Sequence, residues 1–316
     1  MLASHVAMHI PDGFLSTAVA VVFWVISVIV IGYALKRVSQ ELGERQVPLM
    51  GVLAAAIFAG QMLNFTVAGG TSGHLLGAAI ATILLGPWPA ILVLTSVVSI
   101  QALIFQDGGL LALGANLFNM AVVGVAVSYM VYRTIYRLAG GKNWGIFVGG
   151  FVAAWLSIEI AALSCALQLA ISGTSPANIS VPAMGGIHAL IGIGEGLITV
   201  GALAFIYSTR RDLLTHGESA ATQGKLVWVV GLLLAIGLAI LSPLASAYPD
   251  GLEWVAEQHG FLEAAKGPFY TIIPDYVFPG ISNQALATII AGIFGTLLVF
   301  AVALGVGYWR HRRTHA

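Results

Sequence analysis

The chain has 316 residues, of which 59% are apolar and only 8% are charged, with 13 basic and 13 acidic side chains. Soluble domains carry about 25% charged residues, so this composition excludes a cytosolic enzyme and a disordered protein. The zero net charge excludes a nucleic-acid binder, and the single cysteine, Cys165, excludes an internal disulfide framework and the usual thiolate zinc site. A membrane protein built from helices remains.

Hydropathy predicts an all-α, polytopic transmembrane helical bundle. A bilayer-spanning helix needs about 20 mostly apolar residues. Several candidates are short or interrupted, as at Gly86-Pro87-Trp88-Pro89, and such helices are tolerated where they line a protein interior. The nine predicted spans lie at about 16–35, 49–65, 74–86, 88–105, 110–132, 145–172, 185–209, 226–243 and 285–309.

The basic residues predict the orientation of these spans, because positive charge concentrates on the cytoplasmic side of a membrane protein. With the N-terminus outside, 12 of the 13 basic residues fall on the inside, and only Lys266 lies outside. We therefore predict a multi-pass protein of the cell membrane with its N-terminus outside and its C-terminus inside. The inside set is Lys36, Arg37, Arg45, Arg133, Arg137, Lys142, Arg210, Arg211, Lys225, Arg310, Arg312 and Arg313.

The chain divides into pieces of different character. A leader of open status, 1–7, precedes a helical block, 8–209, and a polar cytoplasmic linker, 210–225, leads to a helical hairpin, 226–316. The hairpin encloses an outside loop, 244–284, with five acidic residues and one basic residue. This loop is either a solvated connection or a cap over the first block. No internal repeat is visible, which disfavours a secondary transporter built from inverted halves.

The segment MHIPDGFL (8–15) precedes the first span and contains a turn signal, Pro11-Asp12-Gly13. A histidine at this place is usually a solvated residue of the membrane interface. If translation starts at Met8, however, His9 becomes the second residue. A free amine, the deprotonated amide of the next residue and its imidazole chelate a metal ion in one plane, and such nitrogen sites favour Ni(II) or Cu(II).

A fourth nitrogen is available in the loop from Asn64 to His74, which we place outside between the second and third spans. Its run of small residues, 69–73, allows the backbone to approach a ligand closely. A histidine inside an apolar membrane segment is a candidate functional residue because it needs a partner there. A phosphate site is not indicated, since no Gly-Lys-Ser/Thr follows.

Further polar residues interrupt the apolar spans and are candidates for an outer shell or an ion path. Asn116 and Asn119 share a helix face, which also suits helix–helix hydrogen bonds, and a turn is the plain explanation of Asp107. His188 and Glu195 share a face in the seventh span, and we favour outer-shell roles for them. The complete set is Asp12, Asn64, Gln101, Asp107, Asn116, Asn119, Glu159, His188 and Glu195.

Two other patterns bear on partners. The sequence contains no G-x-x-x-x-G-K-[ST], so the chain does not bind and split ATP by a P-loop. The second span carries Gly51, Ala55 and Ala59 at four-residue spacing, a stripe of small residues that packs closely inside the chain or against a partner helix.

Taken together, these motifs resemble the CbiM/NikM type, the substrate-capture subunits of energy-coupling-factor uptake systems for cobalt and nickel. The resemblance covers about 8–209 and rests on MHIPDGFL, the Gly69–His74 loop, the Gln101–Asn119 segment and HALIGIGEGLIT (188–199). The hairpin, with SPLASAYPDGLE (242–253), is similar to the small NikN-type component that is often fused to them.

The resemblance implies a seven-helix capture domain, joined here to a two-helix hairpin, whose N-terminus tucks into the core from outside. It implies a metal site made by the amine of Met8, the amide and ring nitrogens of His9, and His74. This chain begins seven residues earlier than the family pattern, and an internal Met8 has no free amine. We therefore expect Met8 to be the functional start.

The resemblance also implies a transport subunit rather than an enzyme. Its partners are a transmembrane coupling subunit and two cytoplasmic ATPase subunits, and we expect the Gly51/Ala55/Ala59 stripe to face the coupling subunit. No resident cofactor is expected, because Ni²⁺ or Co²⁺ is the transported ligand. Four in-plane nitrogens favour nickel, which binds above cobalt in the divalent series.

Two alternatives stay open. A stand-alone secondary metal permease would use Glu159, His188 and Glu195 as proton carriers. An intramembrane metallohydrolase would use His74, His188 and Glu195, but no nucleophile motif supports it.

Overall fold

The computed structural model describes residues 8–41, 46–214 and 225–315. The predicted leader, 1–7, and most of the predicted linker, 215–224, lie outside the described residues. The elements in chain order are α1 (Thr17–Glu41), α2 (Val47–Gln61), β1 (Phe65–Val67), β2 (Thr71–Gly73), α3 (Ala78–Leu85), α4 (Pro87–Ile100), α5 (Leu113–Leu117), α6 (Gly124–Leu138), α7 (Asn143–Ser172), α8 (Ala177–Thr209), α9 (Lys225–Ile240), α10 (Gly251–Gln258) and α11 (Gln284–His315).

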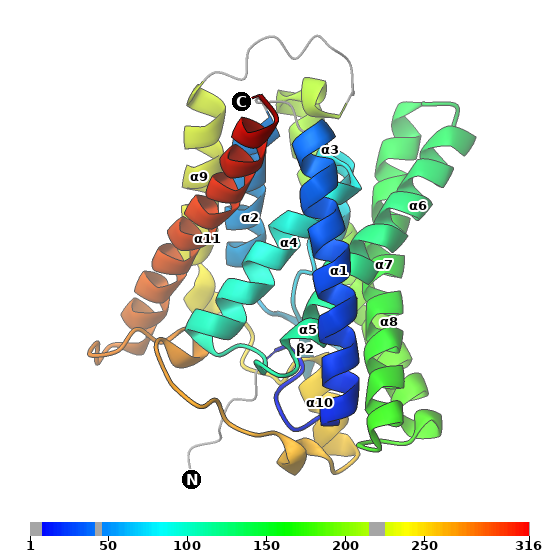
Figure 1. Cartoon of the computed structure of the whole chain (residues 1–316), viewed down its shortest axis with the longest axis vertical. Coiled ribbons are helices and arrows are strands. Elements are labelled where there is room, and N and C mark those ends of the chain that lie inside the picture. Colours follow the sequence, from blue (N-terminus) through cyan, green and yellow to red (C-terminus); the bar gives the residue numbers. More distant parts are fainter. Residues whose placement is uncertain (1–7, 42–45, 215–224, 316) are drawn as a thin grey trace.

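The fold is a helical bundle of membrane-spanning character, as predicted (Figure 1). Within the described residues, six stretches are long and apolar enough to cross a membrane: Thr17–Gln40, Pro87–Phe105, Leu113–Leu138, Asn143–Ser172, Ala177–Thr209 and Gln284–Arg310. The predicted spans 49–65 and 226–243 correspond to shorter apolar helices, Val47–Gln61 and Trp228–Ile240, and 74–86 contains only the eight-residue α3. The number of nine spans and the orientation stay predictions.

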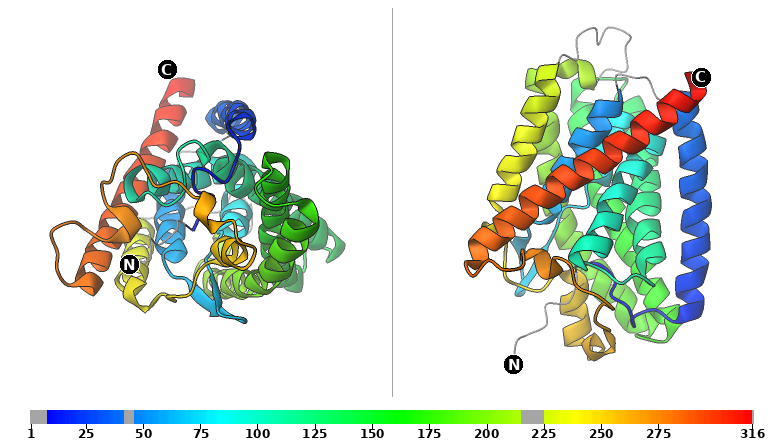
Figure 2. Two further views of the ribbon diagram at one scale, coloured as in Figure 1. Left: turned by 90° about the horizontal axis from the view of Figure 1, so that it is seen from below. Right: turned by 60° about the vertical axis from the view of Figure 1, so that its left-hand side comes forward.

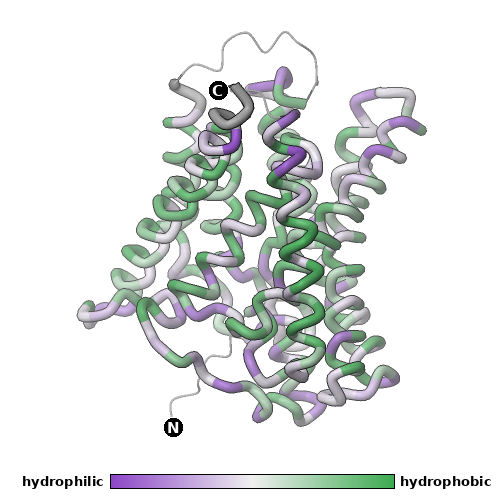
Figure 3. The backbone as a smooth tube through the Cα atoms, in the orientation of Figure 1, coloured by the Kyte–Doolittle hydropathy of each residue, from purple (hydrophilic) through white to green (hydrophobic). Residues whose placement is uncertain are grey.

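The two ends of the bundle differ in character. The end of α1, the α6–α7 connection and the C-terminus lie at one end, and the start of α1 and α10 lie at the other (Figure 1). Hydrophobic residues fill the middle of the helices, and hydrophilic residues gather towards the ends (Figure 3). Lys36 and Arg37 lie in the C-terminal part of α1, and Arg133 and Arg137 lie in the last turns of α6. This layering suits a membrane protein, because charged groups are costly in hydrocarbon.

The helices that precede the site are broken, as the sequence predicts. Gly86 has φ +80° and separates α3 from α4. Two π-helical segments follow, Gln101–Phe105 after α4 and Phe118–Val123 after α5. π-Helical turns are rare and occur frequently at functional sites. Each of these two contains a residue from the candidate set, Gln101 or Asn119.

The small-residue stripe of α2 is used inside the chain. α2 packs against α9 and α11, and α11 crosses the bundle obliquely (Figure 2). Ala55 and Ala59 are fully buried, and a Cβ on Gly51 would lie 3.1 Å from the ring of Phe300 in α11. The expectation that this stripe faces a separate coupling subunit is therefore wrong, because the chain's own C-terminal hairpin covers it.

Candidate metal site

Asp12 anchors the N-terminal segment, residues 8–16, to the bundle. Its carboxylate accepts hydrogen bonds from the backbone N–H groups of Leu110, Leu111 and Ala112, at 3.2, 2.9 and 3.0 Å. These amides lead into α5, where backbone donors have no helical partner and attract negative charge. The predicted outer-shell residue Asp12 thus fixes the chain just after His9.

Asn116 holds the next stretch of the same segment. Its amide oxygen accepts from the backbone N–H of Ile10 at 3.0 Å, and its amide nitrogen donates to the carbonyl of Ile10 at 3.1 Å. Gly109 N–H donates to that carbonyl as well, at 3.0 Å. Asn116 therefore pairs with the N-terminal segment, whereas Asn119 makes the helix–helix bonds: it pairs with Gln168 and Ser164 of α7.

The glycine pair after Asp107 permits this close approach. A Cβ on Gly109 would lie 2.1 Å from a carboxylate oxygen of Asp12 and 2.2 Å from its backbone nitrogen. Gly108 has φ +100°, and a Cβ there would lie 3.0 Å from Cβ of His9. Neither position accepts a side chain while the N-terminal segment is docked.

Gly109→Ala is expected to displace the N-terminal segment, because the added methyl group overlaps the Asp12 anchor. Limited proteolysis should cut the variant before α1 at concentrations of protease that leave the wild type intact. Gly186→Ala is the matched control, since nothing lies within 4 Å of a Cβ there. Equal protection of the two variants would contradict the proposed tight docking.

His9 is buried, with 4% of its surface exposed, and lies against Asp107. Its Nδ1 lies 3.2 Å from the carbonyl oxygen and 3.3 Å from Oδ1 of Asp107. Its Nε2 has no hydrogen-bond partner among the described residues. The His9 backbone N–H likewise has no partner within the described part of the chain. Nε2 and the backbone N–H of His9 are therefore both buried without a hydrogen-bond partner among these residues. This costs free energy unless a ligand interacts with them.

His74 lies beside His9, although 64 residues separate them, with the ring centroids 5.5 Å apart in an edge-to-face arrangement. It stands in the short loop between β2 and α3. Glu195 of α8 fixes this loop, because its carboxylate accepts from the backbone N–H groups of Leu76 and Gly77 at 2.7 and 3.0 Å. His74 Nδ1 donates to the carbonyl of Leu75 at 3.1 Å, so the lone pair of Nε2 is available.

The glycine run before His74 has more than one role. Gly69 and Gly70 have φ +81° and +78°, form the turn between β1 and β2, and have nothing within 4 Å of a Cβ. A Cβ on Gly73 would lie 2.4 Å from Ile191 of α8, and Gly73 also lines the cavity described below. The expectation that this run brings backbone to a ligand stays a prediction, and it applies to Gly73.

The loop of the C-terminal hairpin forms the outer wall of the site. Ser72 donates from its backbone N–H to Pro249 and from its hydroxyl to Tyr248, both at 2.8 Å. Asp250 caps α10 by accepting from Glu253 N–H at 2.8 Å, and its Oδ2 lies 4.0 Å from His74 Nε2. Lys266 N–H donates to the carbonyl of Asp12 at 2.7 Å. Loop 244–284 is therefore a cap over the first block and not a solvated connection.

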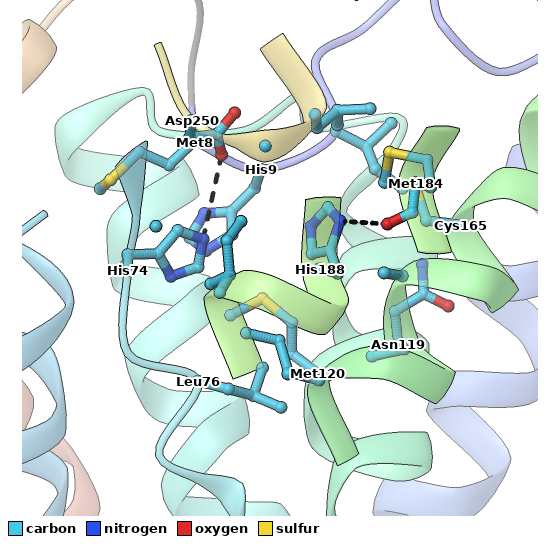
Figure 4. Close-up of a pocket in the computed structure, with 18 of the residues that line it drawn as sticks. Met8, His9, His74, Leu76, Asn119, Met120, Cys165, Met184, His188 and Asp250 are labelled. Carbon is cyan, nitrogen blue, oxygen red and sulfur yellow. Dashed lines mark hydrogen bonds and ion pairs between the residues drawn. The ribbon is translucent and has the colours of Figure 1, made fainter. Parts of the chain in front are cut away.

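A cavity of roughly 80 Å³ opens between these elements (Figure 4). His9 and His74 lie together on one side, next to Asp250, and His188 faces them. His188 donates from Nδ1 to the carbonyl of Met184 at 2.8 Å, which leaves its Nε2 available. Asn116 and Asn119 also line the cavity, and the rest of the lining is apolar or sulfur-containing and includes Met8, Met120, Cys165 and Met184.

Side chains alone do not complete a metal site here. Among the residues that the structure describes, no three His, Cys, Asp or Glu side chains are grouped to hold a metal ion. His9 and His74 bring two imidazoles to the cavity, and Met8 lines it as well.

Electrostatics keep His74 neutral and His9 engaged with a carboxylate. Burial and the neighbouring His9 lower the pKa of His74 to about 4, so its imidazole is uncharged at neutral pH. Burial alone would lower the pKa of His9, but the charge and hydrogen bonds of Asp107 outweigh it and leave that pKa raised. Burial raises the pKa of Asp250 to about 8, so its contact with the neutral His74 is not an ion pair.

The other candidate residues lie around the site rather than in it. Gln101 is fully buried, and its amide atoms have no hydrogen-bond partner in the described ranges. The backbone carbonyl of Asn64 accepts from Ser246 at 2.8 Å. Glu159 does not line the cavity and faces α8 at Gly185, where a Cβ would lie 3.1 Å from Oε1. Glu159, His188 and Glu195 therefore do not form one path, since Glu195 is taken by the His74 loop.

The sequence did not indicate two residues that form hydrogen bonds with the candidate residues around the cavity. Tyr276 of the loop donates its hydroxyl to Asp107 at 2.6 Å, and Gln168 of α7 pairs with Asn119 at 2.9 Å. Asp250 was noted only as one of the loop acids. One signal was available for it, because Pro-Asp-Gly occurs both at 11–13, next to the site, and at 249–251.

This combination, a helical membrane bundle with a buried, histidine-bearing cavity near one end, defines a membrane transport protein. Residues 9–213 match the family described as cobalt uptake substrate-specific transmembrane region (CbiM), and residues 225–312 match the PDGLE domain. The chain therefore belongs to the CbiM family of nickel and cobalt transport proteins, and it is not an enzyme.

The relatives agree over most of the chain. A "Putative fused nickel transport protein NikMN" of Archaeoglobus fulgidus is 41% identical, over 97% of this chain and all of that protein. The fused nickel transport protein NikMN of Rhodobacter capsulatus is 29% identical, over 95% of this chain and 96% of that one. A crystal structure of a transition metal transporter matches with a TM-score of 0.58 and 33% identity, over 68% of this chain and all of that chain.

Proposed function

We propose that this protein captures one divalent transition-metal ion from outside the cell, with nickel preferred over cobalt. The ligands are the amine of Met8, the backbone and ring nitrogens of His9, and Nε2 of His74. The main support is the placement of His9 beside His74 in one cavity, where each has a ring nitrogen without a hydrogen bond to any described residue. Imidazole suits Ni, Cu and Zn, and four in-plane nitrogens select among them.

The proposed ligand set requires a particular ring nitrogen of His9. Nδ1 is the ring nitrogen close enough to the amide nitrogen of its own residue to share a metal ion with it in one plane. In the structure Nδ1 contacts Asp107, and Nε2 has no partner among the described residues. Coordination through Nδ1 therefore requires the His9 ring to turn so that Nδ1 leaves Asp107, with the ring proton on Nε2. Metal-bound histidines commonly donate their second N–H to a carboxylate or a carbonyl.

The preference for nickel is supported by ligand chemistry and by the relatives. Ni²⁺ binds a given nitrogen site more tightly than Co²⁺. The three fused relatives that match 95% or more of this chain carry nickel in their names, whereas the 31%-identical CbiM of Sorangium cellulosum, named a cobalt transport protein, covers 66% of this chain. The C-terminal hairpin thus accompanies the nickel-named proteins.

Uptake is proposed to depend on ATP hydrolysed by partners in the cell membrane. The sequence has no P-loop, and Asp250, Gly251 and Leu252 of the C-terminal hairpin loop form part of the cavity wall. A transmembrane coupling subunit and two ATPase subunits supply the rearrangement that releases the ion inside. Their contact surface lies elsewhere than the buried Gly51/Ala55/Ala59 stripe.

Purified chain that begins at Met8 is expected to bind one Ni²⁺ per molecule, with weaker binding of Co²⁺, in calorimetric titrations with each metal alone. In liposomes the same protein is expected to show no concentrative uptake without its partners. Concentrative uptake driven by an ion gradient would support the permease alternative instead. Absence of Ni²⁺ and Co²⁺ binding would remove the capture function.

A further inference from the structure

Tyr276 of the C-terminal loop contacts Asp107, the residue that lies against His9. The phenol hydroxyl donates to Oδ2 of Asp107 at 2.6 Å, while Oδ1 of the same carboxylate lies 3.3 Å from His9 Nδ1. All three side chains are buried, with 8%, 4% and 4% of the surface exposed in the order Tyr276, Asp107, His9. A continuous chain of contacts thus runs from the hairpin loop to an imidazole in the cavity.

The backbone around Tyr276 is shaped to place this hydroxyl. Asp275 and Tyr276 have φ +52° and +57°, a left-handed conformation that non-glycine residues adopt at a cost. Such strain persists only where the surroundings enforce it. Here the ring of Tyr276 stacks on Phe105, with centroids 4.8 Å apart and planes 17° from parallel, and Phe105 is the last residue of the π-helical segment Gln101–Phe105. Ile273 N–H also donates to the carbonyl of Ile104 at 3.0 Å.

We infer that Tyr276 is a positioning residue for metal capture: it holds Asp107 so that the carboxylate orients the His9 ring. One carboxylate oxygen accepts from the phenol, and the other, which has no hydrogen bond among the described residues, lies 3.3 Å from His9 Nδ1. The fused hairpin thereby sets the geometry of ligands that belong to the first block. This inference rests on the proposed function of His9 as a metal ligand.

The test uses the full chain beginning at Met8, in detergent, with Ni²⁺ alone as the probe. Tyr276→Phe keeps the stacked ring and removes only the hydroxyl. We expect it to weaken Ni²⁺ binding about ten-fold, the low end of what outer-shell changes cost, and to shift the visible absorption of bound Ni²⁺. Tyr270→Phe is the matched control, because its hydroxyl donates to the carbonyl of Leu103 at 2.8 Å in the same loop but does not touch Asp107. It should leave affinity and spectrum unchanged.

A double-mutant cycle separates positioning from general stability. If Tyr276 acts through Asp107, then Tyr276→Phe adds little once Asp107→Asn is present. An equal loss in both backgrounds, or an unchanged affinity and spectrum for Tyr276→Phe in a wild type that binds Ni²⁺, would overturn this inference alone. A wild type that binds no Ni²⁺ would overturn the proposed function and this inference together.

Discussion

His74→Ala is expected to lower Ni²⁺ affinity by more than about 100-fold, beyond the range that changes to outer-shell partners produce. His74 offers Nε2 to the cavity with its Nδ1 occupied by the Leu75 carbonyl, and its pKa near 4 leaves no proton to displace at neutral pH. The loop that carries it is held by Glu195 from a separate helix, so the ligand is fixed before metal arrives. Preorganised ligands lose the least freedom on binding.

His188→Ala is the matched comparison, because His188 lines the same cavity with its own Nε2 available. We expect it to weaken Ni²⁺ binding no more than about ten-fold, as an outer-shell change does. Both affinities are measured by competitive titration with a metal indicator. Equal losses for the two alanine variants would show that the ligand set has been assigned wrongly.

A chain whose Met8 amine is blocked is expected to lose planar Ni²⁺ binding, with an effect at least as large as that of His74→Ala. A peptide nitrogen that joins Ala7 to Met8 is a far weaker ligand than a free amine, and Met8 lines the cavity. The comparison uses two preparations of defined mass, one that begins at Met8 and one that begins at Met1.

The readout is the visible spectrum of bound Ni²⁺ together with its affinity. The preparation beginning at Met8 should give the spectrum of a planar nitrogen site, and removal of the metal with a chelator should abolish it. Tight planar binding by the preparation beginning at Met1 would contradict the amine as a ligand. His74→Ala tests the imidazole ligand separately, so the two predictions fail independently.

Much of the helix pattern was predictable, because hydropathy is a property of short segments. The long helices α7 and α8 and both helices of the C-terminal hairpin lie close to the predicted spans. The deviations fall where the backbone is irregular. The predicted span 110–132 is built from α5, a π-helical turn and α6, and the predicted span 74–86 contains a loop with His74 before the short α3.

The candidate residues were predictable by type but not by partner. Asp12, Asn116 and Glu195 were selected because polar groups are costly in a membrane, and each proves to satisfy backbone groups that hold a candidate ligand in place. The Gly51/Ala55/Ala59 stripe was rightly identified as a close-packing surface, but its partner was misassigned. A regular spacing of small residues predicts that another helix packs closely against them. It does not predict which helix that is.

The sequence by itself determined the class of protein, the approximate helices and the types of ligand, because composition, hydropathy and residue chemistry are local. Only the tertiary structure decided which groups meet. His9 and His74 come together over 64 intervening residues, and Tyr276 meets Asp107 over a separation of 169. Such contacts depend on how the C-terminal hairpin packs against α2 and how its loop covers the N-terminal segment of the first block. That packing is set by contacts between segments far apart in the sequence, which no local pattern specifies.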